Sequence, residues 1–172
     1  MRIHCADGRT VEVPANSLEG ADLTGFDLHR AMLTARVLRG AILTSANLRG
    51  AFLARADLTN ADLRDAILVV AHLDGACLSR VSAHGAMLRG AMLEGAILTE
   101  ADLGESDLTG ALMSGANLRG ANLSGAKLEG AMLDCVDLKG TLLQGATADD
   151  GTVWPAGFVP ALFGVLEHRN DW

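Results

Sequence analysis

GANLRGANLSGAKLEGAMLDC occupies residues 115–135 and repeats with a period of five residues. Divided into fives it becomes GANLR, GANLS, GAKLE and GAMLD, so Ala and Leu keep their places while the other positions vary. On an α-helix, a five-residue step advances each Leu by about 500°, which spreads the apolar residues around the whole surface. On a flat strand, the odd spacing sends alternate Leu side chains to opposite faces. The period therefore predicts a unit made of a short extended piece followed by a turn.

The same period runs through most of the 172-residue chain. The large apolar residue of each unit, here called its centre, recurs from Leu18 to Leu143 in 26 units without an insertion or deletion. Twenty-four centres are Leu, and the exceptions are Ala83 and Met113. Ala stands two residues before the centre in 19 of the 26 units, and Gly stands two residues after it in 15. Because such units can be stabilised only by their neighbours, the pattern predicts a solenoid.

The centres and the preceding Ala residues are predicted to fill the interior. Val81 replaces Ala in the same unit whose centre shrinks to Ala83, as expected if both positions are buried. Gly at the end of a unit suits the positive φ of a type II turn. Val70 occupies that place in one unit, and because a β-branched residue resists positive φ we expect another turn type there. The expected core includes Leu48, Leu68, Leu88, Leu108, Leu128, Ala46, Ala66 and Ala86.

The units ADLTN, ADLRD, ANLRG and ANLSG resemble the A(D/N)LXX motif of the pentapeptide-repeat family. The resemblance covers roughly residues 16–146. It implies an all-β solenoid, the right-handed quadrilateral β-helix, with four units per coil. Twenty-six units then make about 6.5 coils, and a strand spacing of about 4.8 Å gives a rod about 31 Å long.

The two ends depart from the repeat. Residues 1–15 are predicted to form an N-terminal β cap, because IHC and TVEV flank ADGR, a plausible hairpin turn. Residues 147–172 contain WPAGF and resemble the tails that close many members of the family. Pro160 is expected to start a short helix, since the apolar residues from Val159 to Leu166 have helical spacing. This tail is a cap, a dimerisation segment or both, through Trp154, Phe158, Leu162, Phe163 and Leu166.

The sequence carries no recognisable catalytic, cofactor-binding or metal-binding motif, so we expect neither an enzyme nor a cofactor. Three cysteines, Cys5, Cys77 and Cys135, lie far apart and form no CxxC pair. A formal net charge of −7 argues against direct nucleic-acid binding. No apolar run reaches membrane-spanning length, and no signal peptide is visible, so a cytoplasmic protein is expected.

With a filled interior, function is expected on the outer walls. The residue before each centre points outward, and every fourth unit belongs to one wall. On one wall five of six such residues are apolar, against seven of twenty on the other three walls together. Either this stripe contacts a protein partner or a second copy of the chain, or it merely extends the ladders between coils. Its residues are Met32, Phe52, His72, Met92, Leu112 and Met132.

A second wall carries carboxylates 40 residues apart, with further acidic residues at its corners. The resemblance implies a role for such a wall, because the best-known family activity is mimicry of duplex DNA toward DNA gyrase. Within the repeat, however, 15 acidic residues face 11 basic ones, and Arg64 lies on the same wall. The expected acidic wall consists of Asp22, Asp62, Asp102, Asp65 and Glu105.

Two hypotheses about function follow. The first is a non-catalytic scaffold whose walls bind a protein partner, with homodimerisation through the C-terminal segment or the apolar wall. The alternative is a DNA mimic that binds gyrase or another type II topoisomerase, as an inhibitor or as a protein that protects the enzyme from quinolones.

Overall fold

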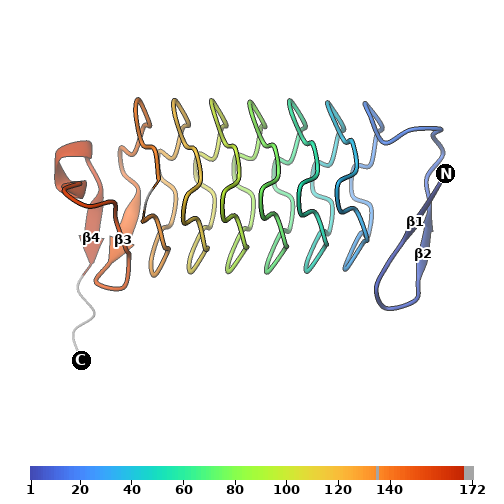
Figure 1. Ribbon diagram of the computed structural model, residues 1–172, viewed down its shortest axis with the longest axis horizontal. Coiled ribbons are helices and arrows are strands. Elements are labelled where there is room, and N and C mark those ends of the chain that lie inside the picture. The colour runs from blue at the N-terminus through green and yellow to red at the C-terminus, as the bar shows by residue number, and fades with distance from the viewer. Residues whose placement is uncertain (135, 169–172) are drawn as a thin grey trace.

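The computed structural model describes residues 1–134 and 136–168. Figure 1 shows a row of stacked coils with a hairpin at the N-terminal end and a compact cap at the C-terminal end. The named elements lie in these two ends: the hairpin holds β1 and β2, and the cap holds β3, η1 and β4. Their bounds are β1 Arg2–His4, β2 Thr10–Glu12, β3 Thr147–Asp149, η1 Pro160–Phe163 and β4 Leu166–His168.

Each five-residue unit consists of an inward residue that is usually Ala, one bridged residue, the centre and a two-residue turn. The turn is closed by a hydrogen bond from the N–H three residues after the centre, as from Ala41 to the Leu38 carbonyl at 3.0 Å. The second turn residue, Gly40, has a φ of 61°. A positive φ at this position alone is the signature of the predicted type II turn.

The expectation of another turn type at Val70 is wrong. Val70 has a φ of 51°, and the turn is closed by Ala71 N–H and the Leu68 carbonyl at 3.0 Å. Val70 also donates its N–H to Arg89 of the next coil at 2.9 Å. Bonds on both sides thus impose the left-handed conformation, although it costs an L-residue roughly 1–2 kcal/mol.

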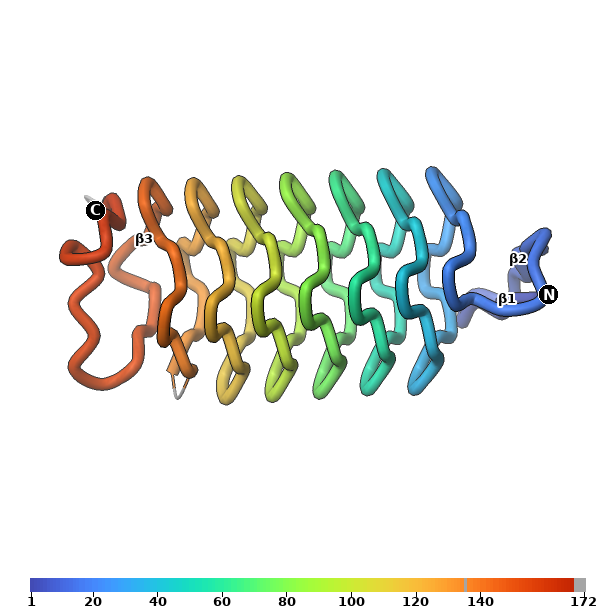
Figure 2. The backbone as a smooth tube through the Cα atoms, turned by 90° about the horizontal axis from the view of Figure 1, so that it is seen from above, coloured from blue at the N-terminus to red at the C-terminus, as the bar shows by residue number. Residues whose placement is uncertain are grey.

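Successive coils pair at intervals of twenty residues, which is four units. Parallel bridges join Asp22 to Ile42 and Ile42 to Asp62, and the same register continues along the rod. Ile42 uses both of its backbone groups toward the preceding coil, because it donates its N–H to the Ala21 carbonyl at 2.9 Å and its carbonyl accepts from the Leu23 N–H at 2.7 Å. Its flanking residues bond the next coil, where the Ala41 carbonyl accepts from the Asp62 N–H at 2.9 Å. Figure 2 shows the coils following one another along a single axis.

Leu and Ala fill the interior. Each residue of the expected core is buried, and all but Leu88, at 4% exposed, are fully enclosed: Leu48, Leu68, Leu88, Leu108, Leu128, Ala46, Ala66 and Ala86. Burial of a Leu side chain stabilises by about 1.5–3 kcal/mol before the cost of chain entropy.

In the unit whose centre is the small Ala83, the inward residue two positions earlier is the larger Val81. Val81 and Ala83 are both buried and line the same internal void, which measures about 10 Å³. Two polar residues at inward positions, Ser106 and Thr141, are buried. The Ser106 hydroxyl donates to the Leu103 carbonyl and the Thr141 hydroxyl to the Leu118 carbonyl, each at 2.7 Å, so neither is left without a partner.

The N-terminal hairpin closes one wall of the first coil. Strands β1 and β2 pair antiparallel, with Ile3 opposite Val11. The edge of β1 then continues onto the coil, because Cys5 forms an antiparallel bridge with Ala31 and Met32 donates its N–H to the His4 carbonyl at 2.8 Å. The hairpin therefore covers part of the strand edge that would otherwise be exposed.

The C-terminal segment continues the ladder for one more coil. Lys127 bridges Thr147, whereas Met132 bridges Val153, a step of 21 residues instead of 20. Strand β3 also pairs parallel with β4, which forms the last rung. The expected short helix is the 3₁₀ helix η1, but it ends at Phe163, so the predicted continuation of the helical spacing to Leu166 is wrong: Leu166 lies in β4.

Among residues 1–134 and 136–168, no helix combines the length and apolar character that a membrane crossing requires.

Candidate interaction surfaces

The apolar stripe, defined as Met32, Phe52, His72, Met92, Leu112 and Met132, forms one continuous ladder. Parallel bridges connect each of its residues to the next, and a further bridge extends it from Met132 to Val153. Five steps of about 4.8 Å make the stripe about 24 Å long. The twenty-residue coil thus places side chains that are far apart in sequence directly above one another.

Exposure varies along the stripe. Met32 is 58% exposed and Met132 is 38% exposed, whereas the four residues between them are half-buried. The rings of Phe52 and His72 stack with centroids 4.9 Å apart and planes inclined by 15°. Each inner side chain is therefore partly covered by its neighbours in the ladder, and the outer faces together form a narrow apolar strip open to solvent.

The acidic wall alternates with neutral side chains. Its ladder reads Asp22, Ile42, Asp62, Ser82 and Asp102. Asp65 and Glu105 are exposed at corners with φ of 56° and 55°.

Two of these five carboxylates lie near basic groups of the same wall. Arg64 bonds both oxygens of Asp62, at 2.9 and 2.5 Å. Glu105 Oε2 lies 3.7 Å from Nε2 of His84. The wall is less negative than a count of its carboxylates indicates.

Outward Asp and Asn side chains have a structural role that the sequence argument missed. Each accepts a hydrogen bond from the backbone N–H two residues later, which stabilises the start of the turn. For example, Asp22 accepts from Thr24 at 3.0 Å, and the hydrogen bonds from Thr24 lower the pKa of Asp22. The units that form this bond contain Asp22, Asp27, Asn47, Asp57, Asp62, Asp102, Asp107, Asn117, Asn122 and Asp137. In the motif A(D/N)LXX the first turn residue stands two positions after the Asp or Asn, and this spacing is the sequence signal for the hydrogen bond.

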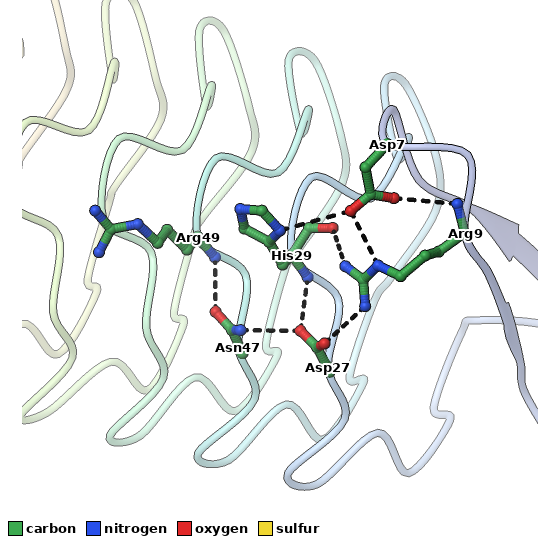
Figure 3. Close-up of polar contacts among 6 residues, drawn as sticks. All are labelled: Asp7, Arg9, Asp27, His29, Asn47 and Arg49. Carbon is green, nitrogen blue, oxygen red and sulfur yellow. Dashed lines mark hydrogen bonds and ion pairs between the residues drawn. The ribbon is translucent and has the colours of Figure 1, made fainter.

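A polar network anchors the hairpin to the rod (Figure 3). Arg9 donates to Asp7 at 2.9 Å, to Asp27 of the first coil at 2.7 Å and to the His29 carbonyl at 3.0 Å. Asn47 of the next coil donates to Asp27 at 2.9 Å, which extends the network by one rung. These groups are exposed and their bonds are used within the fold, so we assign them a structural role.

The C-terminal segment presents both a packed and an open side. Phe158 stacks between Trp154 and Phe163, with centroid distances of 5.0 and 4.6 Å. Leu162 is 81% exposed and Leu166 is 55% exposed. The stacked rings cover the end of the rod, while the two leucines face solvent.

The described residues contain no cluster of metal-binding side chains. No group of three His, Cys, Asp or Glu side chains there lies close enough to hold a metal ion. Cys5 and Cys77 are free, and Cys135 lies outside the described residues.

A sequence model of the family described as pentapeptide repeats matches the chain in eight copies, over residues 41–80, 76–115 and 111–147. HetL, a pentapeptide repeat protein of the cyanobacterium Nostoc involved in heterocyst differentiation regulation, is 29% identical. That similarity covers 88% of this chain and 81% of HetL, with a TM-score of 0.47.

Two further solved structures are similar. Rfr23, a pentapeptide repeat protein of the cyanobacterium Cyanothece, is 34% identical over 67% of this chain and 65% of its own, with a TM-score of 0.27. QnrB1, a plasmid-mediated fluoroquinolone resistance protein, is 19% identical over 81% of this chain and 87% of its own, with a TM-score of 0.44. A search of the curated proteins found no match.

Proposed function

We propose, from the premise that the chain belongs to the pentapeptide-repeat family, that it is a non-catalytic scaffold whose outer walls bind a protein partner. Pentapeptide-repeat proteins are generally non-catalytic. The observation that carries the proposal is the apolar stripe, because its residues form a single ladder whose ends at Met32 and Met132 remain open to solvent. Apolar side chains gathered on one face are typical of a protein interaction site.

The finer architecture belongs to the same proposal. We assign the rod to a right-handed quadrilateral β-helix of about 6.5 coils, supported by 26 units and by parallel bridges twenty residues apart. We divide the chain into an N-terminal cap at residues 1–15, the repeat at 16–146 and a C-terminal cap and dimerisation segment at 147–172. Free thiols at Cys5 and Cys77 support a cytoplasmic location.

A paired substitution tests the stripe. Met92→Glu with Leu112→Glu places two charges in its centre and is expected to abolish partner capture or to change the oligomeric state, with the rod still folded. The matched control is Met87→Glu with Ile97→Glu, because these residues hold the same outward position on other walls and are 41% and 43% exposed. Light scattering and affinity capture report the result. Equal behaviour of both double variants in both measurements would contradict the proposal.

Homodimerisation is the simplest form of such an interaction, through the stripe or through the C-terminal segment. Truncation after Asp150 removes the exposed Leu162 and Leu166 and also uncovers the last coil. If the segment forms the dimer, the truncated chain is monomeric or aggregates when examined by light scattering. A soluble dimer of unchanged affinity would exclude this segment as the dimer contact and leave the stripe.

A second candidate is the gyrase-directed DNA mimic, favoured by the regular carboxylates Asp22, Asp62 and Asp102 on one ladder. A rod with such a wall fits a basic DNA-binding groove. A supercoiling assay with purified gyrase, with and without a fluoroquinolone, tests this function. The variant Asp65→Asn with Glu105→Gln removes two negative charges at the corners. Neither side chain accepts a hydrogen bond from a turn N–H of the described residues, so the fold should be retained while any effect of the protein on gyrase is weakened. No effect of the native chain at large molar excess would exclude the mimic for that enzyme.

A further inference from the structure

Arg36 places a charged side chain at an inward position of the repeat. Equivalent positions in the following units, Ala46 and Ala56, are fully buried. Arg36 instead is exposed, and its guanidinium makes no hydrogen bond or ion pair with any residue in the described part of the chain. A charged group at a position that elsewhere carries Ala, with its donors unused, requires an explanation.

Beside Arg36, one rung of the rod is missing. Ile42 and the outward residues after it donate their N–H to the coil before, as Ile42 does to Ala21 at 2.9 Å. Val37 pairs only forward, with Asp57, and its N–H and carbonyl have no partner among the described residues on the side of the first coil. The N–H of Leu18, which would complete this rung, is also unpaired there.

The missing rung is recessed and not simply a free end. Two cavities of about 350 and about 380 Å³ meet at Arg36. One is lined by Met1, Asn16, Ser17, Leu18, Ala35, Arg36 and Val37, and the other by Arg2, Ile3, His4, Met32, Leu33 and Arg36. We call this region the N-terminal notch. On its far side stands the hairpin strand β1, which covers the neighbouring wall of the first coil.

The charge of the notch is opposite to that of the chain. The protein has 21 Asp and Glu residues and a net charge of −7, yet neither cavity has a carboxylate in its lining. Arg2 is held by Glu12 at 2.6 Å, which leaves Arg36 as the free arginine of the notch among the described residues. Ile3, Met32 and Leu33 provide an apolar floor beside it.

We propose that the N-terminal notch binds an extended peptide segment that carries a carboxylate. The peptide backbone pairs with the open N–H and carbonyl of Val37, as a strand added to a sheet edge. Its carboxylate accepts hydrogen bonds from the Arg36 guanidinium, whose planar donors suit that group. Its apolar side chains lie on the floor made by Ile3, Met32 and Leu33. This site shares only Met32 with the apolar stripe. The stripe variant Met92→Glu with Leu112→Glu leaves the notch unchanged, so either proposal can fail without the other.

The test uses a blocked five-residue peptide, acetyl-Ala-Val-Glu-Val-Ala-amide, and its Gln counterpart. The full chain is titrated with each peptide while the backbone amides of Leu18 and Val37 are followed by NMR. The Glu peptide is expected to shift both amides and to slow the hydrogen exchange of Val37. The Gln peptide is expected to bind at least about tenfold more weakly, because a charge-assisted hydrogen bond is lost.

The variant Arg36→Ala restores the residue that most units have at this position, so the fold is expected to be retained. In this variant the preference for Glu over Gln should disappear. The control Arg55→Ala removes the same charge from an exposed corner outside both cavities and should keep the preference. The proposal is overturned if the Glu peptide shifts neither amide at millimolar concentration, if Arg36→Ala retains the preference, or if acetate alone reproduces the full shifts.

Discussion

Asp74 and Glu94 lie one coil apart at the same corner of the rod, where their carboxyl groups are close enough to interact. The backbone holds them in register, because Gly75 donates its N–H to the Glu94 carbonyl at 2.9 Å. Burial raises the pKa of Glu94, and the nearby carboxyl group of Asp74 raises it further. Glu94 Oε2 is buried and accepts no hydrogen bond from the described residues. The twenty-residue period thus stacks two acids in an arrangement that favours the protonated form of Glu94.

The pair predicts a pH-dependent stability. A raised pKa means that Glu94 stabilises the fold below its unfolded value, and that this contribution is lost as the pH rises through the folded value. Glu94→Gln, which supplies a donor to Asp74 at any pH, should therefore be more stable than the native chain at pH 7, with the difference shrinking toward pH 4. Urea unfolding midpoints between pH 4 and 8 measure this.

Asp62→Asn is the control, because its effect on stability should depend on pH in the opposite direction. The hydrogen bond from Arg64 is the largest cause that lowers the pKa of Asp62, so its contribution is present above the unfolded value and lost on acidification. This variant should be less stable than the native chain at pH 7 and converge with it at low pH. A stability difference for Glu94→Gln that is the same at every pH would contradict a raised pKa of Glu94.

The exchange of volume between Val81 and Ala83 predicts non-additive mutations. Both are buried beside a void of only about 10 Å³, so Ala83→Leu alone overfills the interior and should cost about 1–3 kcal/mol. Val81→Ala alone leaves a cavity and should cost about 1 kcal/mol. The double variant recreates the common Ala and Leu arrangement and should recover most of the loss. A double-mutant cycle by urea unfolding measures the coupling, and strict additivity would show that the two side chains do not share space.

The C-terminal cap should open locally when its central ring is removed. Phe158 contacts Trp154 and Phe163, and each aromatic pair contributes about 0.5–1.5 kcal/mol beyond its buried area. Phe158→Ala should therefore speed hydrogen exchange at Leu166, whose N–H donates to the Ala146 carbonyl at 2.7 Å, and leave the exchange of Leu108 unchanged. Leu162→Ala, at an 81% exposed position, is the control and should have no effect on either amide. Equal protection of Leu166 in both variants would show that the rings do not hold the cap.

Sequence alone indicated the family and the five-residue unit because both depend on a strictly local pattern. The centre, the small residue before it and the turn after it recur often enough that a few departures, such as Phe26, do not hide them. The number of units per coil is different, because no residue within one unit encodes it. It came from the resemblance, and the alignment of Met32 above Phe52 on one ladder depends on it.

Features at the two ends could not be predicted, because they depend on how segments without the repeat dock on the coils. The extra residue between Met132 and Val153 shifts the register of the last rung, and only the pairing reveals it. The notch beside Val37 exists because β1 covers one wall and leaves the next one open. The hydrogen bond from Thr24 to Asp22, in contrast, could have been predicted from the two-residue spacing between them. From the sequence, the charge of Asp22 was assigned to partner binding instead.

At Val70 the hydrogen bonds between units impose a positive φ, although a β-branched residue prefers a negative one. This site supports a matched pair of substitutions. Its φ of 51° is imposed by bonds from neighbouring units, so Val70→Gly should relieve strain and stabilise the rod by up to about 1 kcal/mol. Gly110 has a φ of 66° and open space where a Cβ would lie, so Gly110→Val should cost about 1–2 kcal/mol through conformation alone. Thermal and urea unfolding measure both variants. If Val70→Gly destabilised the rod as much as Gly110→Val, side-chain contacts at the corner, and not backbone strain, would determine which residue is tolerated there.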